Sequence, residues 1–86
     1  NPFARTFERE TEIRFQLARG GFVELRVYNL LGQPVRSLVQ RVLPAGEHSF
    51  FWEGKNENGE FLSSGVYFYQ LRQEGFSQMR KMTLLH

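Results

Sequence analysis

Residues 11–28, TEIRFQLARGGFVELRVY, decide the fold class. Apolar side chains occupy every second position on both sides of a glycine pair: Ile13, Phe15, Leu17, Val23, Leu25 and Val27. An apolar residue at every second position is the period of a half-buried β-strand. Gly20 and Gly21 separate the two runs and fit a hairpin connection. We therefore expect two β-strands here, joined by a hairpin.

The rest of the chain continues the strand pattern. His48, Phe50 and Trp52 share one face of a third run, and residues 66–71 are apolar on both faces, as in a central strand. Residues 79–85 form the last run. Turn-forming residues separate the runs at short intervals, at 29–32, 44–46, 56–59 and 74–75. Many short strands with regular turns indicate an all-β protein built as a β-sandwich.

One stretch between two prolines fits a second pattern. The apolar residues Val35, Leu38, Val39 and Val42 have the i, i+3, i+4, i+7 spacing of a helix face. Pro34 and Pro44 bound this stretch, so any helix would be short. Because valine is abundant here and favours strands, an irregular or bulged strand is the preferred interpretation. A short helix is the alternative.

Five residues are the candidates for the core: Phe15, Leu25, Val27, Trp52 and Tyr67. Trp52 is the only tryptophan and alternates in phase with Phe50. An exposed row of Phe50, Trp52, Tyr67 and Tyr69 would form a flat surface on which sugars stack, but large aromatic side chains more often fill a core, which is the favoured interpretation. Tyr67 is also a candidate for a tyrosine corner, in which its hydroxyl bonds to nearby backbone.

The composition describes one small domain. The chain has 86 residues and a net charge of +2, and its arginines are scattered, unlike the concentrated cations of nucleic-acid-binding proteins. No apolar run approaches the roughly 20 residues that span a membrane, so we expect neither nucleic acid binding nor a membrane span. Because the sequence begins at Asn1 rather than Met, we expect a removed leader or an upstream domain, and residues 1–86 to be a single module excised from a larger protein.

Residues suited to catalysis or metal binding are few. The chain contains neither Cys nor Asp, so it has no disulfide and no thiolate metal site. His48 lies among aromatic residues, where packing is more common than general-base catalysis, and His86 is terminal. Residues 56–60, NENGE, resemble a calcium loop but lack a downstream bidentate acid, so a polar turn is favoured. We expect no enzyme activity, no cofactor and no metal.

An ordered set of motifs carries a family likeness over nearly all of the chain. The motifs are NPF at 1–3, TEIRFQL at 11–17, VYNLLGQPVRSLV at 27–39, LPAGEHSFFWEGKNENGEFLSSGVYFYQL at 43–71 and RKMTLL at 80–85. Together they resemble the C-terminal sorting domain of the type IX (Por) secretion system. They also resemble the Ig-like domain of the flagellar hook-capping protein, which shares much of the pattern. Glu53 and Gly54 stand where the sorting family commonly has Asp-Gly followed by acidic residues.

The resemblance implies an antiparallel Ig-like β-sandwich of about seven strands. It implies a non-catalytic sorting and anchoring module that directs a larger cargo protein through type IX secretion. The expected partners are the type IX translocon, a sortase-like peptidase and the upstream cargo domain, and the chain is expected to be a monomer. The expected location is the periplasm in transit, and then the cell surface or the exterior.

The resemblance also points to a sorting signal in the last two strands. The candidates are Gly65, Val66, Tyr67, Lys81, Met82, Leu84 and Leu85. An ordinary terminal hairpin that closes the sandwich would use the same residues. Two alternative functions stay open: a structural Ig-like spacer or adhesion module, and a carbohydrate-binding module of a secreted hydrolase.

Overall fold

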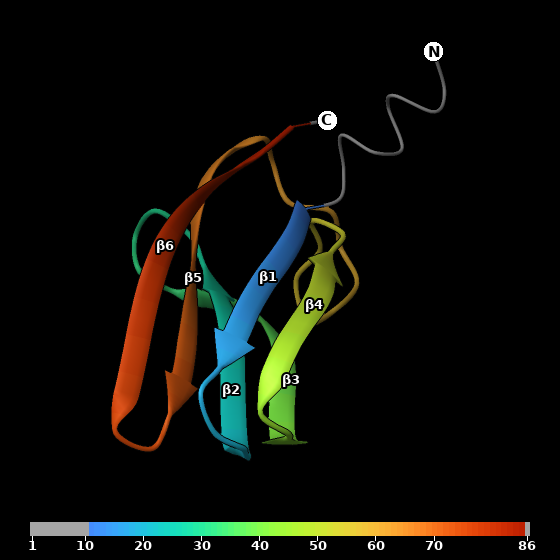
Figure 1. Cartoon of the computed structure of the whole chain (residues 1–86). Coiled ribbons are helices and arrows are strands. Elements are labelled where there is room, and N and C mark those ends of the chain that lie inside the picture. Colours follow the sequence, from blue (N-terminus) through green and yellow to red (C-terminus); the bar gives the residue numbers. More distant parts are fainter. Residues whose placement is uncertain (1–10, 86) are drawn as a thin grey trace.

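The computed structural model describes residues 11–85, which form six antiparallel strands in two sheets (Figure 1). The strands are β1 (Thr11–Leu17), β2 (Gly21–Tyr28), β3 (Pro34–Leu43), β4 (Gly46–Trp52), β5 (Gly65–Gln73) and β6 (Phe76–Leu84). One sheet pairs β1 with β4, and the other has the order β3-β2-β5-β6. The predicted all-β antiparallel sandwich is confirmed, with six strands in the described residues where about seven were expected. These residues contain no helix long and apolar enough to cross a membrane.

The chain passes from one sheet to the other between β1 and β2, so the hairpin predicted at Gly20 and Gly21 is wrong. β1 pairs with β4 along its whole length, whereas β2 pairs with β3 and β5. Each of these strands has one apolar face. Placing β1 and β2 in opposite sheets lets those faces cover each other, whereas a hairpin would turn both the same way.

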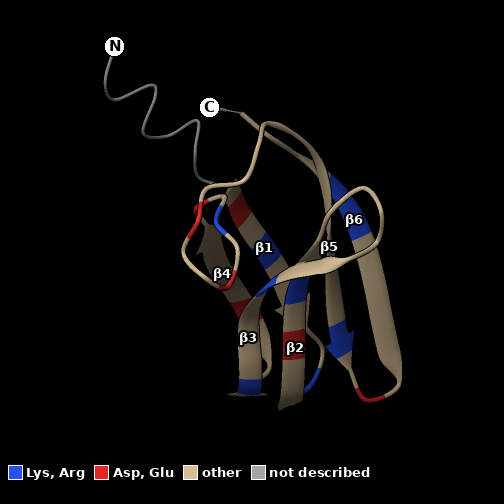
Figure 2. Ribbon diagram, turned by 180° about the vertical axis from the view of Figure 1, so that it is seen from behind, with Lys and Arg blue, Asp and Glu red and all other residues tan. Residues whose placement is uncertain are grey.

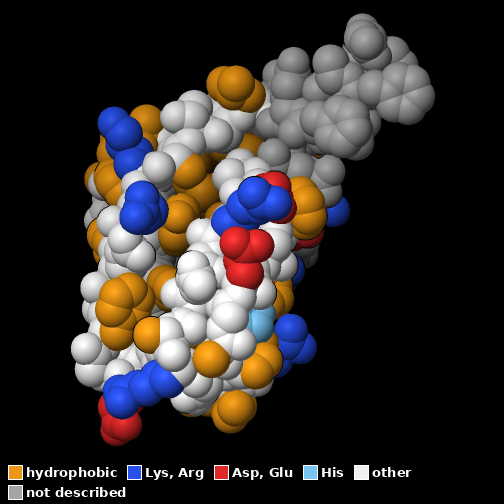
Figure 3. Space-filling model, viewed as in Figure 1, with side chains coloured by type: hydrophobic (Ala, Val, Ile, Leu, Met, Phe, Trp, Pro, Cys, Tyr) orange, Lys and Arg blue, Asp and Glu red, His pale blue; other side chains and the backbone are white. Residues whose placement is uncertain are grey.

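The core lies between the two sheets and draws on all six strands. Its buried residues are Ile13, Leu17, Val23, Leu25, Val27, Val39, Leu43, Trp52, Tyr67, Leu71, Met82 and Leu84. Four of the five candidate core residues lie in this set, and Phe15 is half-buried and packs against it. β1 and β4 lie in front of β2 and β3 (Figure 1). Both acidic and basic side chains lie over the outer face of this two-stranded sheet (Figure 3).

β3 is a strand with two bulges, which confirms the preferred interpretation of residues 35–42. Leu25 pairs with Val39 and the next residue of β2 pairs with Ser37, so Leu38 is an extra residue in β3. Val35 is skipped in the same way at the start of the strand. The two extra residues shift the apolar pattern out of its period of two, which produces the helix-like spacing. Val35 and Leu38 both pack against the core.

Trp52 and Tyr67 join the two sheets. Trp52 ends β4 and is 0% exposed, and its ring lies 5.1 Å from the ring of Tyr67 on β5 at an interplanar angle of 65°. The indole Nε1 of Trp52 donates a hydrogen bond to the Lys55 carbonyl at 3.0 Å. The hydroxyl of Tyr67 donates one to the Ser63 carbonyl at 2.8 Å. The predicted tyrosine corner is therefore confirmed.

The last two strands form a hairpin, as the apolar pattern predicts. β5 and β6 pair from Gly65 opposite Leu84 to Gln73 opposite Phe76. β5 lies between β2 and β6, so it is a central strand. Met82 and Leu84 are buried in the sandwich, which explains the apolar character of β6.

We predict that Tyr67→Phe lowers the free energy of unfolding by about 1 kcal/mol, because the ring contact with Trp52 stays and only the hydrogen bond to Ser63 is lost. Urea unfolding followed by Trp52 fluorescence measures the change. The control is Tyr69→Phe, since Tyr69 is half-buried and its hydroxyl makes no hydrogen bond within residues 11–85. Equal stability of the two variants would show that the tyrosine corner contributes nothing.

Candidate functional site

Two five-residue turns, at 29–33 and 56–60, have the same construction. In the first, the Oδ1 atom of Asn29 accepts hydrogen bonds from the backbone amides of Leu31 and Gln33, both at 3.0 Å. The Nδ2 atom of Asn29 donates to the side chain of Gln33 at 2.8 Å. The backbone amide of Gly32 donates to the Asn29 carbonyl at 3.0 Å. We call residues 29–33 the leucine turn.

The second turn, which we call the polar turn, repeats each of these contacts. Asn56 Oδ1 accepts from the amides of Asn58 and Glu60 at 3.0 Å, and its Nδ2 donates to Glu60 Oε1 at 3.0 Å. The glycines at the fourth position have φ angles of 82° at Gly32 and 81° at Gly59, a conformation that favours glycine. The first, fourth and fifth residues therefore fix the turn, and the second and third side chains take no part in it.

The polar turn uses its second side chain to fasten itself to β3. The Glu57 amide donates to the Val35 carbonyl at 3.0 Å, and its carboxylate accepts from the Ser37 amide. The same carboxylate lies 3.5 Å from the Arg36 guanidinium, which also reaches Glu53 at 3.6 Å. Side-chain oxygens of Asn56, Glu57 and Glu60 are thus engaged in the turn and in its link to β3. Residues 11–85 hold no group of three or more acidic or histidine side chains placed to bind a metal.

The leucine turn lies across the outer face of the four-stranded sheet. From behind, the β2–β3 connection extends over β5 toward β6 (Figure 2). Its second and third residues are exposed, Leu30 by 69% and Leu31 by 83%. Beneath it is a hollow of about 350 Å³, lined by Tyr28, Leu30, Gly32, Phe68, Gln70 and Met79. The turn and the sheet therefore enclose a hollow whose lining is mainly apolar, with Gln70 as its polar side chain from the sheet.

A row of cross-strand neighbours extends this surface to the edge of the sheet. Tyr28 pairs with Phe68, and Phe68 pairs with Lys81, so these three side chains lie side by side on the outer face. Met79 lies one row away on β6 and is 55% exposed. We define the leucine-turn patch by six residues: Tyr28, Leu30, Leu31, Phe68, Met79 and Lys81. Of these six, sequence reasoning named only Lys81 as a site residue, although two leucines inside a turn were a visible signal.

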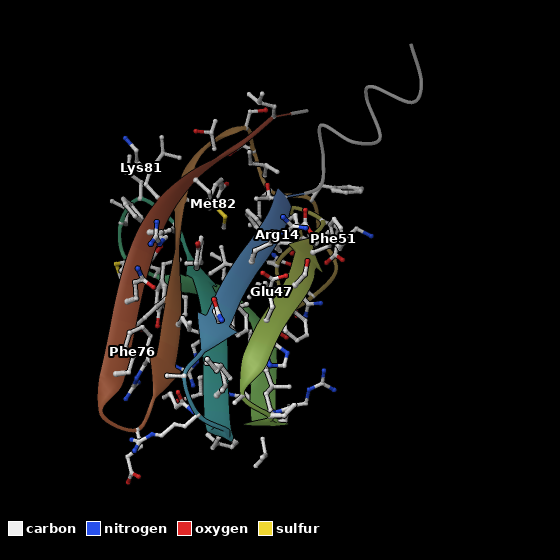
Figure 4. The ribbon with its side chains drawn as sticks, in the orientation of Figure 1. Arg14, Glu47, Phe51, Phe76, Lys81 and Met82 are labelled. Atoms are coloured by element: carbon white, nitrogen blue, oxygen red, sulfur yellow. The ribbon has the colours of Figure 1, made fainter. Side chains whose placement is uncertain are left out.

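The predicted sorting residues do not form one surface. Tyr67, Met82 and Leu84 are buried in the core, and Leu85 follows β6 with its side chain exposed. Gly65 and Val66 begin β5 and are partly buried. Lys81 is exposed on the outer face, so that it points away from the sandwich while its neighbour Met82 points into it (Figure 4).

The residues weighed for catalysis also have structural contacts. His48 Nε2 donates a hydrogen bond to the Pro44 carbonyl at 2.8 Å, and its ring lies 5.6 Å from the ring of Phe15. His86 and the NPF motif at residues 1–3 lie outside the described residues. Trp52 is buried, so it cannot contribute to an exposed aromatic surface on which sugars stack. The carbohydrate-binding alternative, which depended on that exposed surface, is therefore wrong.

Comparisons relate the chain to a flagellar protein. The family model of the FlgD Ig-like domain matches residues 4–75. The structure of FlgD from P. aeruginosa is similar with a TM-score of 0.65 and 24% identity, over 87% of this chain and 60% of that one. The structure of FlgD from Xanthomonas campestris, which is linked to the hook capping essential for flagellar assembly, is similar with a TM-score of 0.68 and 24% identity. This similarity covers 88% of this chain and 56% of that one. The chain thus spans 56% to 60% of the matched chains. No curated protein gives a significant match.

The family match overturns the predicted type IX sorting function. The predicted translocon, sortase-like peptidase and cargo domain as partners are wrong with it, as is the location in the periplasm and at the cell surface. The alternative of a spacer or adhesion module is replaced by the family match. The physical reason for the error is that the shared motifs fall largely on turns and on core positions such as Trp52 and Tyr67. Such motifs indicate the β-sandwich fold and not the biological process in which a protein with that fold takes part.

We predict that millimolar calcium leaves the melting temperature unchanged, because side-chain oxygens of Asn56, Glu57 and Glu60 already have partners. Thermal unfolding in calcium and in a chelator provides the measurement. The matched control is Asn56→Ala, which removes the acceptor for two backbone amides and lowers the melting temperature in both conditions. A melting temperature that rises with calcium in the native chain but not in Asn56→Ala would contradict the prediction.

Proposed function

Because this chain belongs to the FlgD Ig-like domain family, we propose that it is a structural domain of a hook-capping protein. In this role it contacts other protein subunits during assembly of the flagellar hook. The observation that carries the proposal is the family match over residues 4–75, which takes in every strand from β1 to β5. FlgD of Xanthomonas campestris is linked to hook capping, and we extend that link to this chain.

We propose that the domain acts by binding and not by catalysis. Its buried side chains are all apolar or aromatic, and the described residues include no buried charged side chain. The polar side chains of the first and fifth residues hold the two turns, and Glu57 fastens the polar turn to β3. What the sandwich offers is a set of surfaces, one of which is the leucine-turn patch with its exposed apolar side chains. Surfaces of this kind suit contact between subunits.

We also propose that the domain works as one unit of a longer protein, as expected for a single module. The matched FlgD chains are longer than this one, which spans 56% to 60% of their length. In such an arrangement the Ig-like sandwich presents binding surfaces while the rest of the protein supplies further contacts. The activity of the whole protein would then depend on both parts.

We predict that deletion of the gene from its source organism removes the flagellar hook, because the similar FlgD of Xanthomonas campestris is linked to a hook capping that is essential for flagellar assembly. Electron microscopy of isolated basal bodies and a swimming assay give the readouts. The full-length gene restores both, whereas a gene that lacks the segment for residues 11–85 restores neither. Hooks of normal number and length in the deletion strain would refute the proposed function.

A further inference from the structure

The two turns provide an internal comparison that isolates the role of Leu30 and Leu31. The hydrogen bonds of both turns use the side chains of the first and fifth residues and the backbone of the first, third, fourth and fifth residues. No side chain of the second or third residue takes part, so these two positions accept different side chains. The polar turn has Glu57 and Asn58 there, and the leucine turn has two leucines that remain 69% and 83% exposed. The construction of the turn does not require leucine, and exposure of apolar surface to water is unfavourable.

Leu30 belongs to a larger apolar surface, and Leu31 is its exposed neighbour in the turn. Leu30 shares the hollow of about 350 Å³ with Tyr28, Phe68 and Met79. Single exposed apolar residues are ordinary on a protein surface, but a contiguous apolar patch marks a site of interaction. The turn is held by five hydrogen bonds, two from its backbone and three through the Asn29 side chain. A partner would therefore meet a surface that is already ordered.

The charge of the patch defines the partner further. Lys81 is its only charged residue, and no carboxylate within residues 11–85 lies within ion-pair distance of it. Two other cations on the same face do form ion pairs, since Arg26 lies 2.8 Å and Arg72 lies 4.0 Å from the carboxylate of Glu24. The patch thus carries apolar side chains and, at its edge, one cation that has no ion pair within residues 11–85. Its complement is an apolar segment that carries a carboxylate.

We propose that the leucine-turn patch binds an apolar segment of a protein partner that carries an acidic residue beside its apolar side chains. An apolar side chain of the partner enters the hollow over Phe68 and Met79, and the carboxylate pairs with Lys81. The flexible thioether of Met79 lets the hollow adjust to that side chain. This inference rests on the proposed function, because it names the surface through which the domain contacts another flagellar subunit.

A second copy of this chain is a poorer partner than an acidic segment. A two-fold contact through the leucine-turn patch uses the same surface on both copies. It would place Lys81 of each copy in one interface with no carboxylate from either patch. Like charges in one interface disfavour association. The partner therefore has a sequence different from this patch.

The test uses two short labelled peptides and three variants of the 86-residue chain. The peptides carry the same Leu and Phe residues, and one has Glu where the other has Lys. Leu30→Glu with Leu31→Asn gives the leucine turn the middle residues of the polar turn, so the fold is kept. Lys81→Glu reverses the charge of the patch. Phe51→Ser is the control, since Phe51 is 58% exposed on the outer face of the other sheet (Figure 4).

The acidic peptide binds the native chain and the Phe51→Ser variant equally, as measured by fluorescence anisotropy. The double leucine variant binds it at least about tenfold more weakly, which corresponds to about 1.4 kcal/mol. Lys81→Glu binds the basic peptide in preference to the acidic one. Circular dichroism and thermal unfolding check that every variant is folded. Equal binding by the native chain and the double leucine variant, or an unchanged preference in Lys81→Glu, would overturn the inference.

Purified hook subunits of the source organism separate this inference from the proposed function. Binding of the subunit to the native chain, with loss in the double leucine variant, supports both. Binding that survives in that variant keeps the proposed function and overturns the inference. If the hook subunit does not bind but the native chain still prefers the acidic peptide, the proposed function is contradicted. The preference of the leucine-turn patch for an acidic apolar segment is then still supported. A dimer of the native chain that the double variant loses would make a second copy the partner and overturn the inference.

Discussion

The contact between Trp52 and Tyr67 is the interaction on which the rest of the molecule depends. It is the place where the two-stranded sheet and the four-stranded sheet meet through large rings, 5.1 Å apart. The two side chains also hold the segment that connects their strands, Trp52 through the Lys55 carbonyl and Tyr67 through the Ser63 carbonyl. With both ends of that segment fixed, the polar turn is held against β3 and β5 is aligned between β2 and β6. A chain with no cysteine obtains this order from packing and hydrogen bonds, without a disulfide.

The same turn construction serves two purposes in this fold. At residues 56–60 the middle side chains are polar, and Glu57 fastens the turn to Arg36 and to the backbone of β3. At residues 29–33 they are leucines that stay exposed over the outer face of β5. One turn therefore secures the sandwich, and the other presents an apolar surface. The hydrogen bonds of the two turns are the same, so local geometry does not explain why their middle side chains differ. We attribute the difference to the different roles of the two turns.

Much of the fold could be predicted from the sequence, and the errors have physical causes. The period of two located the strands, and the aromatic spacing identified Trp52 and Tyr67 as core residues that the structure buries. The path between β1 and β2 could not be predicted, since Gly20 and Gly21 permit either a hairpin or a crossing. The choice depends on the partner β4, far away in the chain. The predicted function was wrong for a related reason, because two families share motifs that specify the sandwich. The leucine-turn patch needed the structure, since Leu30, Phe68 and Lys81 come together only across strands.

The central claim is that the domain meets its flagellar partner through the leucine turn and the face of β5 and β6 beneath it. The most direct measurement is a nuclear magnetic resonance titration of the isotope-labelled chain with purified hook subunits. We expect the largest amide shifts on residues 29–33, on Phe68 and on residues 79–81. Shifts that centre on residues 47–51, on the outer face of the two-stranded sheet, would contradict the claim.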